Sequence, residues 1–243
     1  YVGIKKINFI GSDININYKF DNKLLTILSG KSKLNNETIS FKGSTSFKPF
    51  FFDLNIDLEK VNLLKLFDQK FLINNLLNSN LYLHNNFNGS LSINIDNLSK
   101  NKIFDSAKIN IMFKNGILIF DDTTLVSKNF GNIKFFDSNL IEINKKNILR
   151  TKLILNVTDE KKFFQRFQIP KNIRKSINKF YFEIDKDLNS DDLKIYRVEI
   201  HSKKKKYPVE SINDYLKNVD FEVKFNSIYD LNNFFKEIIK QTN

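Results

Sequence analysis

The sequence predicts an all-β fold, mainly antiparallel, in which a large sheet with one apolar face must either close on itself or hold something apolar. Apolar and polar residues alternate in nearly every stretch, most clearly at 13–20 (DININYKF), and a period of two places successive side chains on opposite faces of a strand. Turn residues such as Gly11-Ser12 and Asn115-Gly116 separate these stretches, as hairpin turns do. A few short helices, including an amphipathic C-terminal helix, complete the predicted fold.

An N-terminal segment, 1–60, is expected to consist of strands alone. The alternation and its breaks place these strands at 4–10, 13–20, 24–31, 38–47 and 49–58. In the last strand, alternate residues from Phe50 to Leu58 share one face, and acidic and amide side chains take the other. Pro49 is expected at the first residue of that strand, where its missing N–H does not interrupt the ladder.

Residues 61–79 are apolar without clean alternation, which predicts a helical connection and a boundary between two segments. The alternation resumes in a C-terminal β segment, 80–225. Strands are expected there at 80–85, 89–96, 107–115, 117–121, 131–137, 140–144, 149–158, 177–185, 193–201 and 219–225. The pair Asn115-Gly116 favours a type I′ hairpin turn.

Two helices are predicted in or after this segment. The first runs from Asp159 to Gln168 and ends before Ile169-Pro170, because a proline disfavours helix at the residue before it. The second lies in the terminal segment 226–243, where Ser227 can cap a helix that reaches about Gln241. Its apolar stripe is expected to pack on the sheet as a lid, and a membrane-surface helix is the alternative. The stripe consists of Ile228, Leu231, Phe234, Phe235, Ile238 and Ile239.

Composition excludes several classes of function. The chain has 243 residues and no cysteine, so disulfides, thiol catalysis and Cys-ligated metals are excluded. Its net charge of +12 comes from lysines spread along a chain that is also rich in Asn, Ile and Phe, as in AT-rich genomes, so no nucleic-acid partner is expected. The chain starts at Tyr1 and has no apolar span of membrane length, so a membrane anchor is expected in a segment outside it.

No motif in the sequence predicts catalysis. His84 and His201 are too few for a closed zinc site and are interpreted as ordinary strand residues. The carboxylate doublets at 121–122 and 191–192 fall where turns are expected. Glycine-rich phosphate-binding loops and the GxSxG nucleophile motif do not occur. The chain is therefore expected to be no enzyme, with no catalytic residue, metal or cofactor.

One basic run stands out in this chain. It follows a predicted strand and is either a solvated loop tip or a contact with an anionic surface such as lipid headgroups. The run consists of Lys203, Lys204, Lys205 and Lys206.

Four stretches together resemble the C-terminal region of AsmA-like proteins, bacterial relatives of the chorein-type bridge-like lipid-transfer proteins. Residues 88–118 match as a glycine-opened strand, a short linker and a strand that enters an Asn-Gly hairpin. Residues 125–141 match as a Gly-containing strand pair, and 149–184 as a strand, a Phe-rich helix, a proline-basic connection and a return strand. Residues 41–67 match as a strand pair followed by a short helix. The family's N-terminal membrane helix has no counterpart in this chain. The basic run and the terminal helix of this chain have no counterpart in the family.

The resemblance implies a long curved sheet that forms an apolar groove. It also implies a non-enzymatic protein of the periplasm of a Gram-negative bacterium, tethered to the inner membrane. It would bind phospholipid acyl chains, and would transport phospholipid between inner and outer membrane or support outer-membrane assembly. Two alternatives stay open: a closed β-sandwich scaffold of structural or adhesin type without ligand, and a glycan-active β-sandwich enzyme. The alternation assigns the groove lining to Ile14, Ile16, Tyr18, Phe52, Leu54, Ile56, Leu91, Ile93, Ile95, Ile109, Ile111 and Phe113.

Overall fold

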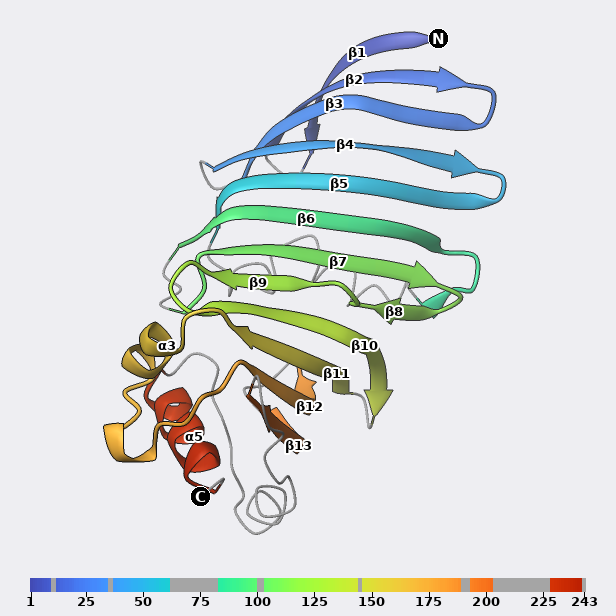
Figure 1. The fold of residues 1–243 in the computed structure, drawn as a ribbon. Coiled ribbons are helices and arrows are strands. Elements are labelled where there is room, and N and C mark those ends of the chain that lie inside the picture. The colour runs from blue at the N-terminus through green and yellow to red at the C-terminus, as the bar shows by residue number, and fades with distance from the viewer. Residues whose placement is uncertain are drawn as a thin grey trace. The chain divides into compact units, whose positions relative to one another are not determined.

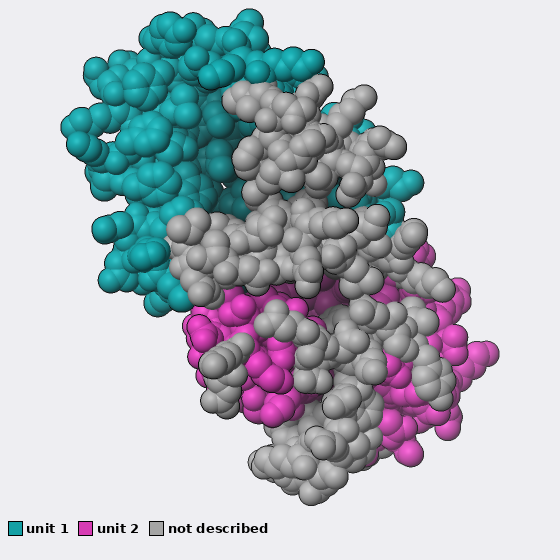
Figure 2. Space-filling view, turned by 180° about the vertical axis from the view of Figure 1, so that it is seen from behind, with its two compact units in different colours: residues 1–101, 105–123 teal, residues 102–104, 124–243 magenta. Residues whose placement is uncertain are grey.

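The structure, a computed structural model, describes most of the chain as one mainly antiparallel sheet of thirteen strands with short helices (Figure 1). The all-β prediction is therefore confirmed. The chain divides into two compact units, 1–101 with 105–123 (unit 1) and 102–104 with 124–243 (unit 2), which Figure 2 distinguishes by colour. The described residues are 1–9, 12–34, 37–61, 83–99, 103–143, 146–188, 193–202 and 228–241.

Unit 1 contains eight strands that follow the chain order from β1 to β8. Neighbouring strands pair antiparallel, except that β5 and β6 pair in parallel. The strands predicted in the N-terminal segment are confirmed. The bounds are β1 Val2–Phe9, β2 Ser12–Asp21, β3 Leu24–Leu34, β4 Glu37–Phe47, β5 Phe50–Val61, β6 Asn88–Leu98, β7 Ser106–Lys114 and β8 Ile117–Ile119.

The expected position of Pro49 is wrong by one residue. Phe47 pairs with Phe50, so Lys48 and Pro49 form a two-residue turn and β5 begins after the proline. The proline therefore occupies a position that needs no ladder hydrogen bond at all.

The strand expected at 80–85 is wrong in its described part, because residues 83–86 form turns. The amide N–H of the Asn88 side chain donates to the carbonyl oxygen of Asn85 at 2.9 Å and closes this turn. Asparagine side chains favour turns by such local bonds, and this outweighed the short apolar run that predicted a strand. Val61 ends β5, and the rest of the predicted helical connection lies outside the described residues.

The Asn115-Gly116 turn between β7 and β8 has the predicted geometry. Asn115 has φ 50° and Gly116 has φ 78°, and positive φ at both central residues defines a type I′ turn. A glycine tolerates this conformation without steric cost, and asparagine is the next most tolerant residue.

Gly43→Ala is expected to destabilise unit 1 by more than about 1 kcal/mol. A Cβ at this position would lie 2.1 Å from the backbone oxygen of Asp53 on the neighbouring strand, and a paired backbone cannot move aside. The free energy of unfolding in urea measures this effect. Gly3→Ala is the control, because its Cβ would meet only the far end of the Tyr18 ring. Equal stability of the two variants would contradict the account.

Unit 2 contains five strands, ordered β9-β10-β11-β12-β13 and antiparallel throughout, together with its helices. The alternation did not predict β9, because its four residues are too few to show a period of two. The strand expected at 219–225 lies outside the described residues. The bounds are β9 Thr124–Ser127, β10 Gly131–Ile143, β11 Lys146–Val157, α3 Glu160–Arg166, η2 Lys171–Ile173, β12 Lys179–Asp187, β13 Leu193–His201 and α5 Ile228–Lys240.

The two strands expected at 131–137 and 140–144 are one strand, β10, with an irregularity in its middle. The register against β11 shifts between Phe136 and Asn139, and Asp137 has φ 47°. The buried Ser138 hydroxyl bonds with the hydroxyl of Thr151 on β11. These residues form a β-bulge, which uses the same residue types as a turn but lets the strand continue.

Helix α3 is capped by Asp159, the residue at which the predicted helix was expected to start. The Asp159 carboxylate accepts a hydrogen bond from the backbone N–H of Lys162 at 3.0 Å, and this bond satisfies a free donor of the first turn. The same bond, followed by other contacts with Lys162, lowers the pKa of Asp159 below its ordinary value of 3.8.

Asp159→Ala is expected to lower the urea midpoint of unfolding at neutral pH and to have little effect in acid. The folded-state pKa is depressed, so the contribution of this carboxylate is present above pH 3.8 and is lost as pH falls through the folded-state value. Asp159→Asn is the control, since asparagine caps helices without a charge. A difference between wild type and Asp159→Ala that persists unchanged in acid would contradict this assignment.

Helix α5 packs on the sheet of unit 2 by its apolar stripe, as predicted (Figure 1). Leu231, Phe234, Phe235, Ile238 and Ile239 are all buried, and Phe235 contacts the rings of both central phenylalanines of β12. Helix α5 has thirteen residues, and the described part of the chain contains no helix of the length and apolarity that a membrane crossing requires.

Candidate functional site

The strongest candidate site is one face of the sheet in unit 1, where apolar residues from six strands fall into register. Directly paired residues point to the same side of a sheet. Three rows of paired residues cross β2 to β7 in strand order, and together they are called the apolar face below. The rows are Ile16-Gly30-Phe41-Ile56-Ile93-Ile109, Tyr18-Ile27-Gly43-Leu54-Leu91-Ile111 and Phe20-Leu25-Thr45-Phe52-Gly89-Phe113.

The structure brings the predicted groove-lining residues to this one side of the sheet. Ten of the twelve belong to the three rows. The other two extend it: Ile95 pairs with Leu58 and Ala107, and Ile14 pairs with Ile7. Leu25, Ile27 and Phe41 on the neighbouring strands belong to the same face, and only the pairing register reveals them.

Burial of the apolar face falls from β7 towards β2. On β6 and β7 the predicted residues are sealed, with exposed fractions from 2% to 5%. On β5, Phe52 is buried, whereas Leu54 and Ile56 are half-buried. On β2, Ile14, Ile16 and Tyr18 are all half-buried. The accessible part of the apolar face is therefore its part on β2 to β5.

Aromatic rings lie over glycines on this face. A Cβ on Gly30 would lie 2.2 Å from the Phe41 ring, and one on Gly89 would lie 2.5 Å from the Phe52 ring. In both pairs the ring belongs to the residue that pairs directly with the glycine on the adjacent strand. The rings thus cover the gaps that glycines leave and keep the apolar surface continuous.

The opposite face of the same strands is polar. The side-chain amide of Asn94 donates to Asn55 at 3.0 Å and to Asp57 at 2.7 Å, across the parallel pair β5-β6. The Ser92 hydroxyl donates to Asn110 on β7 at 3.0 Å. The sheet of unit 1 is therefore amphipathic, apolar on one side and hydrogen-bonded on the other.

Unit 2 has a closed core instead of an accessible apolar face. The side chains of Phe163 and Phe180 have no exposed surface, and α5 covers the strands beside them. A cavity of about 40 Å³ lies among apolar side chains that include Phe167 and Phe234. An engineered cavity that admits benzene measures roughly 150 Å³, so this cavity is too small for an acyl chain.

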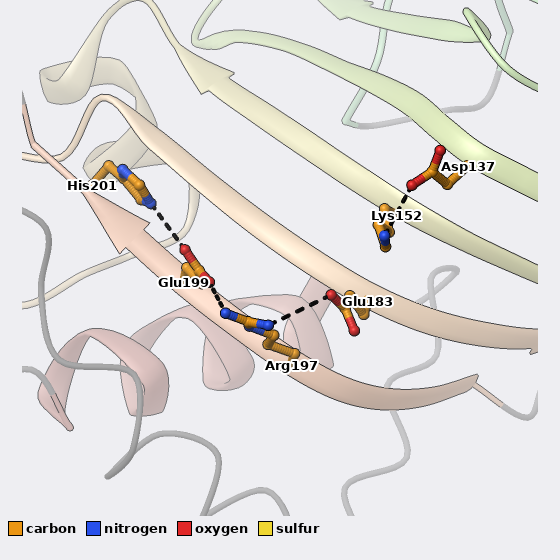
Figure 3. Close-up of polar contacts among 6 residues, drawn as sticks. All are labelled: Asp137, Lys152, Glu183, Arg197, Glu199 and His201. Carbon is orange, nitrogen blue, oxygen red and sulfur yellow. Dashed lines mark hydrogen bonds and ion pairs between the residues drawn. The ribbon is translucent and has the colours of Figure 1, made fainter.

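The outer face of unit 2 carries a ladder of ion pairs across β12 and β13 (Figure 3). The Nε2 atom of His201 lies 3.2 Å from Oε2 of Glu199, which also bonds with the Arg197 guanidinium. The same guanidinium lies 3.9 Å from Glu183. Each of these carboxylates has a cationic partner, so the ladder ties neighbouring strands together.

Two further ion pairs extend this ladder to β11. Lys152 Nζ donates to Asp137 Oδ2 at 2.9 Å, and this hydrogen bond raises the pKa of Lys152 (Figure 3). Arg150 donates two bonds to Asp185, at 3.0 and 2.9 Å, which raise the pKa of the guanidinium. Burial and a bond to the same carboxylate raise the pKa of Tyr196.

The two histidines considered from the sequence lie in different places. His201 ends β13 as expected and belongs to the ladder, whereas His84 lies in the turn region before β6. Lys203 to Lys206 lie outside the described residues. Within the described ranges, His, Asp and Glu side chains nowhere gather in threes as a metal site would require.

The fold and the site together define an amphipathic β-sheet protein with one accessible apolar face. Comparison with family models, curated proteins and solved structures gives no significant match for this chain. The resemblance to AsmA-like proteins therefore stays an expectation from the sequence.

Proposed function

We propose that this chain is a non-enzymatic lipid-handling module, in which the apolar face of unit 1 binds the acyl chains of phospholipids. The observation that supports this most is the register of apolar rows across six strands, combined with the incomplete burial of those rows on β2 to β5. Transfer of each methylene group from water to such a surface contributes about 0.8 kcal/mol. The headgroup stays in water, so binding requires no buried charge and no covalent chemistry.

The AsmA-like resemblance supplies the setting of this proposal. In it, the module works in the periplasm of a Gram-negative bacterium, and a segment outside this chain tethers it to the inner membrane. Its role is then phospholipid transport between inner and outer membrane, or support of outer-membrane assembly.

The closed β scaffold is the second candidate function, and the sealed core of unit 2 favours it. There the aromatic side chains of the strands, α3 and α5 fill the space against the sheet. If the half-buried residues of unit 1 hold no ligand in solution, the whole chain belongs to this class.

Two variants that differ only in the face they alter test lipid binding. The double variant Ile16→Asp with Ile56→Asp places two carboxylates on the accessible part of the apolar face. The control, Asn17→Asp with Asn55→Asp, adds the same charge on the polar face one residue away. Phospholipid is extracted from each purified protein and quantified by mass spectrometry against protein concentration.

We expect wild type and control to copurify with phospholipid, and the apolar-face variant to lose roughly tenfold or more of it, because a carboxylate must desolvate beside an acyl chain. Circular dichroism of all three proteins should show the same β content. A wild type that purifies free of lipid would favour the closed scaffold, and equal lipid in both variants would contradict the assigned face.

A further inference from the structure

One end of the sheet in unit 1 gathers most of its exposed apolar side chains. Between β2 and β8, eight large apolar residues are exposed in the described residues, and seven of them lie at the end where the three two-residue turns occur. Their exposed fractions run from 38% to 49%. The seven are Phe20, Leu24, Phe47, Phe51, Leu83, Met112 and Ile117, and Leu28 is the eighth.

Strand pairing places these turns side by side along one end of the sheet. The three turns and the seven exposed residues beside them are called the hairpin-tip row below. Leu24 pairs with Ser46, which pairs with Phe51, and Phe51 pairs with Asn88. The side-chain oxygen of Asn88 accepts a bond from the backbone N–H of Asn115 at 2.9 Å, which joins the β7-β8 turn to the row. The residues of the row therefore lie side by side, although the sequence separates them by up to about a hundred residues.

Each of the three two-residue turns places an exposed lysine beside these apolar side chains. Lys23 and Lys48 lie within their turns, and Lys114 precedes the third. None of the three makes an ion pair with a described residue. One carboxylate, Asp21 at the end of β2, lies next to these turns, so the three lysines give the row a net positive charge.

The far end of the same strands is mixed in charge, because Glu59 and Asp96 are exposed carboxylates there and Lys60 and Lys108 are exposed lysines. The turn end is distinguished by its exposed aromatic and aliphatic side chains, beside which the three unpaired lysines lie. Lysine beside exposed Phe and Leu is the composition that membrane-surface elements present to anionic lipid.

We propose that the hairpin-tip row is the surface by which unit 1 contacts a bilayer that contains anionic phospholipid. The aromatic and aliphatic side chains of the turns enter the interfacial region of the bilayer, and the three lysines bind the phosphate groups around them. Apart from Phe20, which belongs to both, this surface is distinct from the apolar face, which binds acyl chains in the function proposed above, and the contact does not depend on that function.

Flotation with vesicles tests this surface. The full chain is mixed with vesicles of phosphatidylcholine alone or of phosphatidylcholine with about one third phosphatidylglycerol, and bound protein is measured after centrifugation. Wild type is expected to float with the anionic vesicles only, and less so at high salt. A protein that floats with neither composition would overturn the proposal.

Two triple variants of equal charge locate the contact. Lys23→Gln, Lys48→Gln and Lys114→Gln together should weaken binding by about a hundredfold, at about fivefold per lysine. The control removes three exposed lysines away from the turns: Lys42→Gln, Lys60→Gln and Lys108→Gln. It should bind within about threefold of wild type. An equal loss in both variants would mean that net charge alone drives binding and would overturn the proposed surface.

A third variant tests the apolar part of the row and separates it from lipid uptake. Phe47→Ser with Phe51→Ser changes two side chains that are each 48% exposed, so folding should be unaffected. Binding to anionic vesicles should fall at least about tenfold, while the phospholipid that copurifies with the protein stays at the wild-type amount. Unchanged vesicle binding would overturn the insertion of these side chains. Loss of copurified lipid alone would count against the apolar face instead.

Discussion

Phe235→Ala is expected to lower the free energy of unfolding of unit 2 by about 3–5 kcal/mol. The Phe235 ring lies within 4.5 to 6.4 Å, between ring centroids, of five other phenylalanine rings. One of these rings belongs to α3, one to Phe167 directly after α3, two to β12 and one to α5 itself. Loss of the ring removes buried apolar area and leaves a void beside the existing cavity, because the strands cannot collapse onto the space.

Lys236→Ala is the matched control for this prediction. Lys236 follows Phe235 on α5 but is exposed, and alanine favours helix, so its unfolding free energy should change by at most about 0.5 kcal/mol. Urea unfolding followed by circular dichroism measures both variants. A loss below about 1 kcal/mol for Phe235→Ala would mean that α5 does not seal unit 2.

Ile111→Asp is expected to destabilise unit 1 by about 4 kcal/mol or more at neutral pH. Ile111 is 3% exposed and pairs with Leu91 on the sealed part of the apolar face. An aspartate there loses its hydration and gains no partner, which raises its pKa in the folded state. The variant should therefore regain stability as pH falls, opposite to the effect expected for the Asp159 cap.

Met112→Asp is the control one residue further along the same strand. Met112 is 48% exposed on the opposite face, so its carboxylate stays hydrated and the unfolding free energy should change little. Comparable destabilisation by the two aspartates in urea would contradict the assignment of β7 faces. Ile16 and Ile56 are half-buried, so aspartates at these two positions should destabilise the sheet less than an aspartate at Ile111.

The period-two alternation predicted most of the fold, because a strand with one buried face needs such a pattern locally. The prediction was wrong where the same residue types favour two different backbone structures. Asp137-Ser138 forms a bulge within β10 where the sequence predicted a break, since both features favour small polar residues. The parallel pairing of β5 with β6 also left no sign in either strand, because parity sets the face of a residue but not its partner strand.

The candidate site was predictable only in part for the same reason. Alternation placed Ile16 and Ile93 on apolar faces of their own strands, and the register shows that those faces coincide. The burial gradient from β7 to β2 depends on what packs against each strand and could not be derived from parity. The hairpin-tip row was hidden too, because its residues come from turns far apart in the chain.

Photo-crosslinking tests the proposed lipid binding most directly. A benzophenone amino acid replaces Ile16, Tyr18 or Leu54 on the apolar face, or Asn17, Lys19 or Asn55 on the polar face, in cells grown with radiolabelled phosphate. Irradiation should attach labelled phospholipid to the protein at 16, 18 and 54 and leave 17, 19 and 55 unlabelled, a period-two pattern along each strand. Equal labelling on both faces, or none on either, would contradict an apolar face that binds acyl chains.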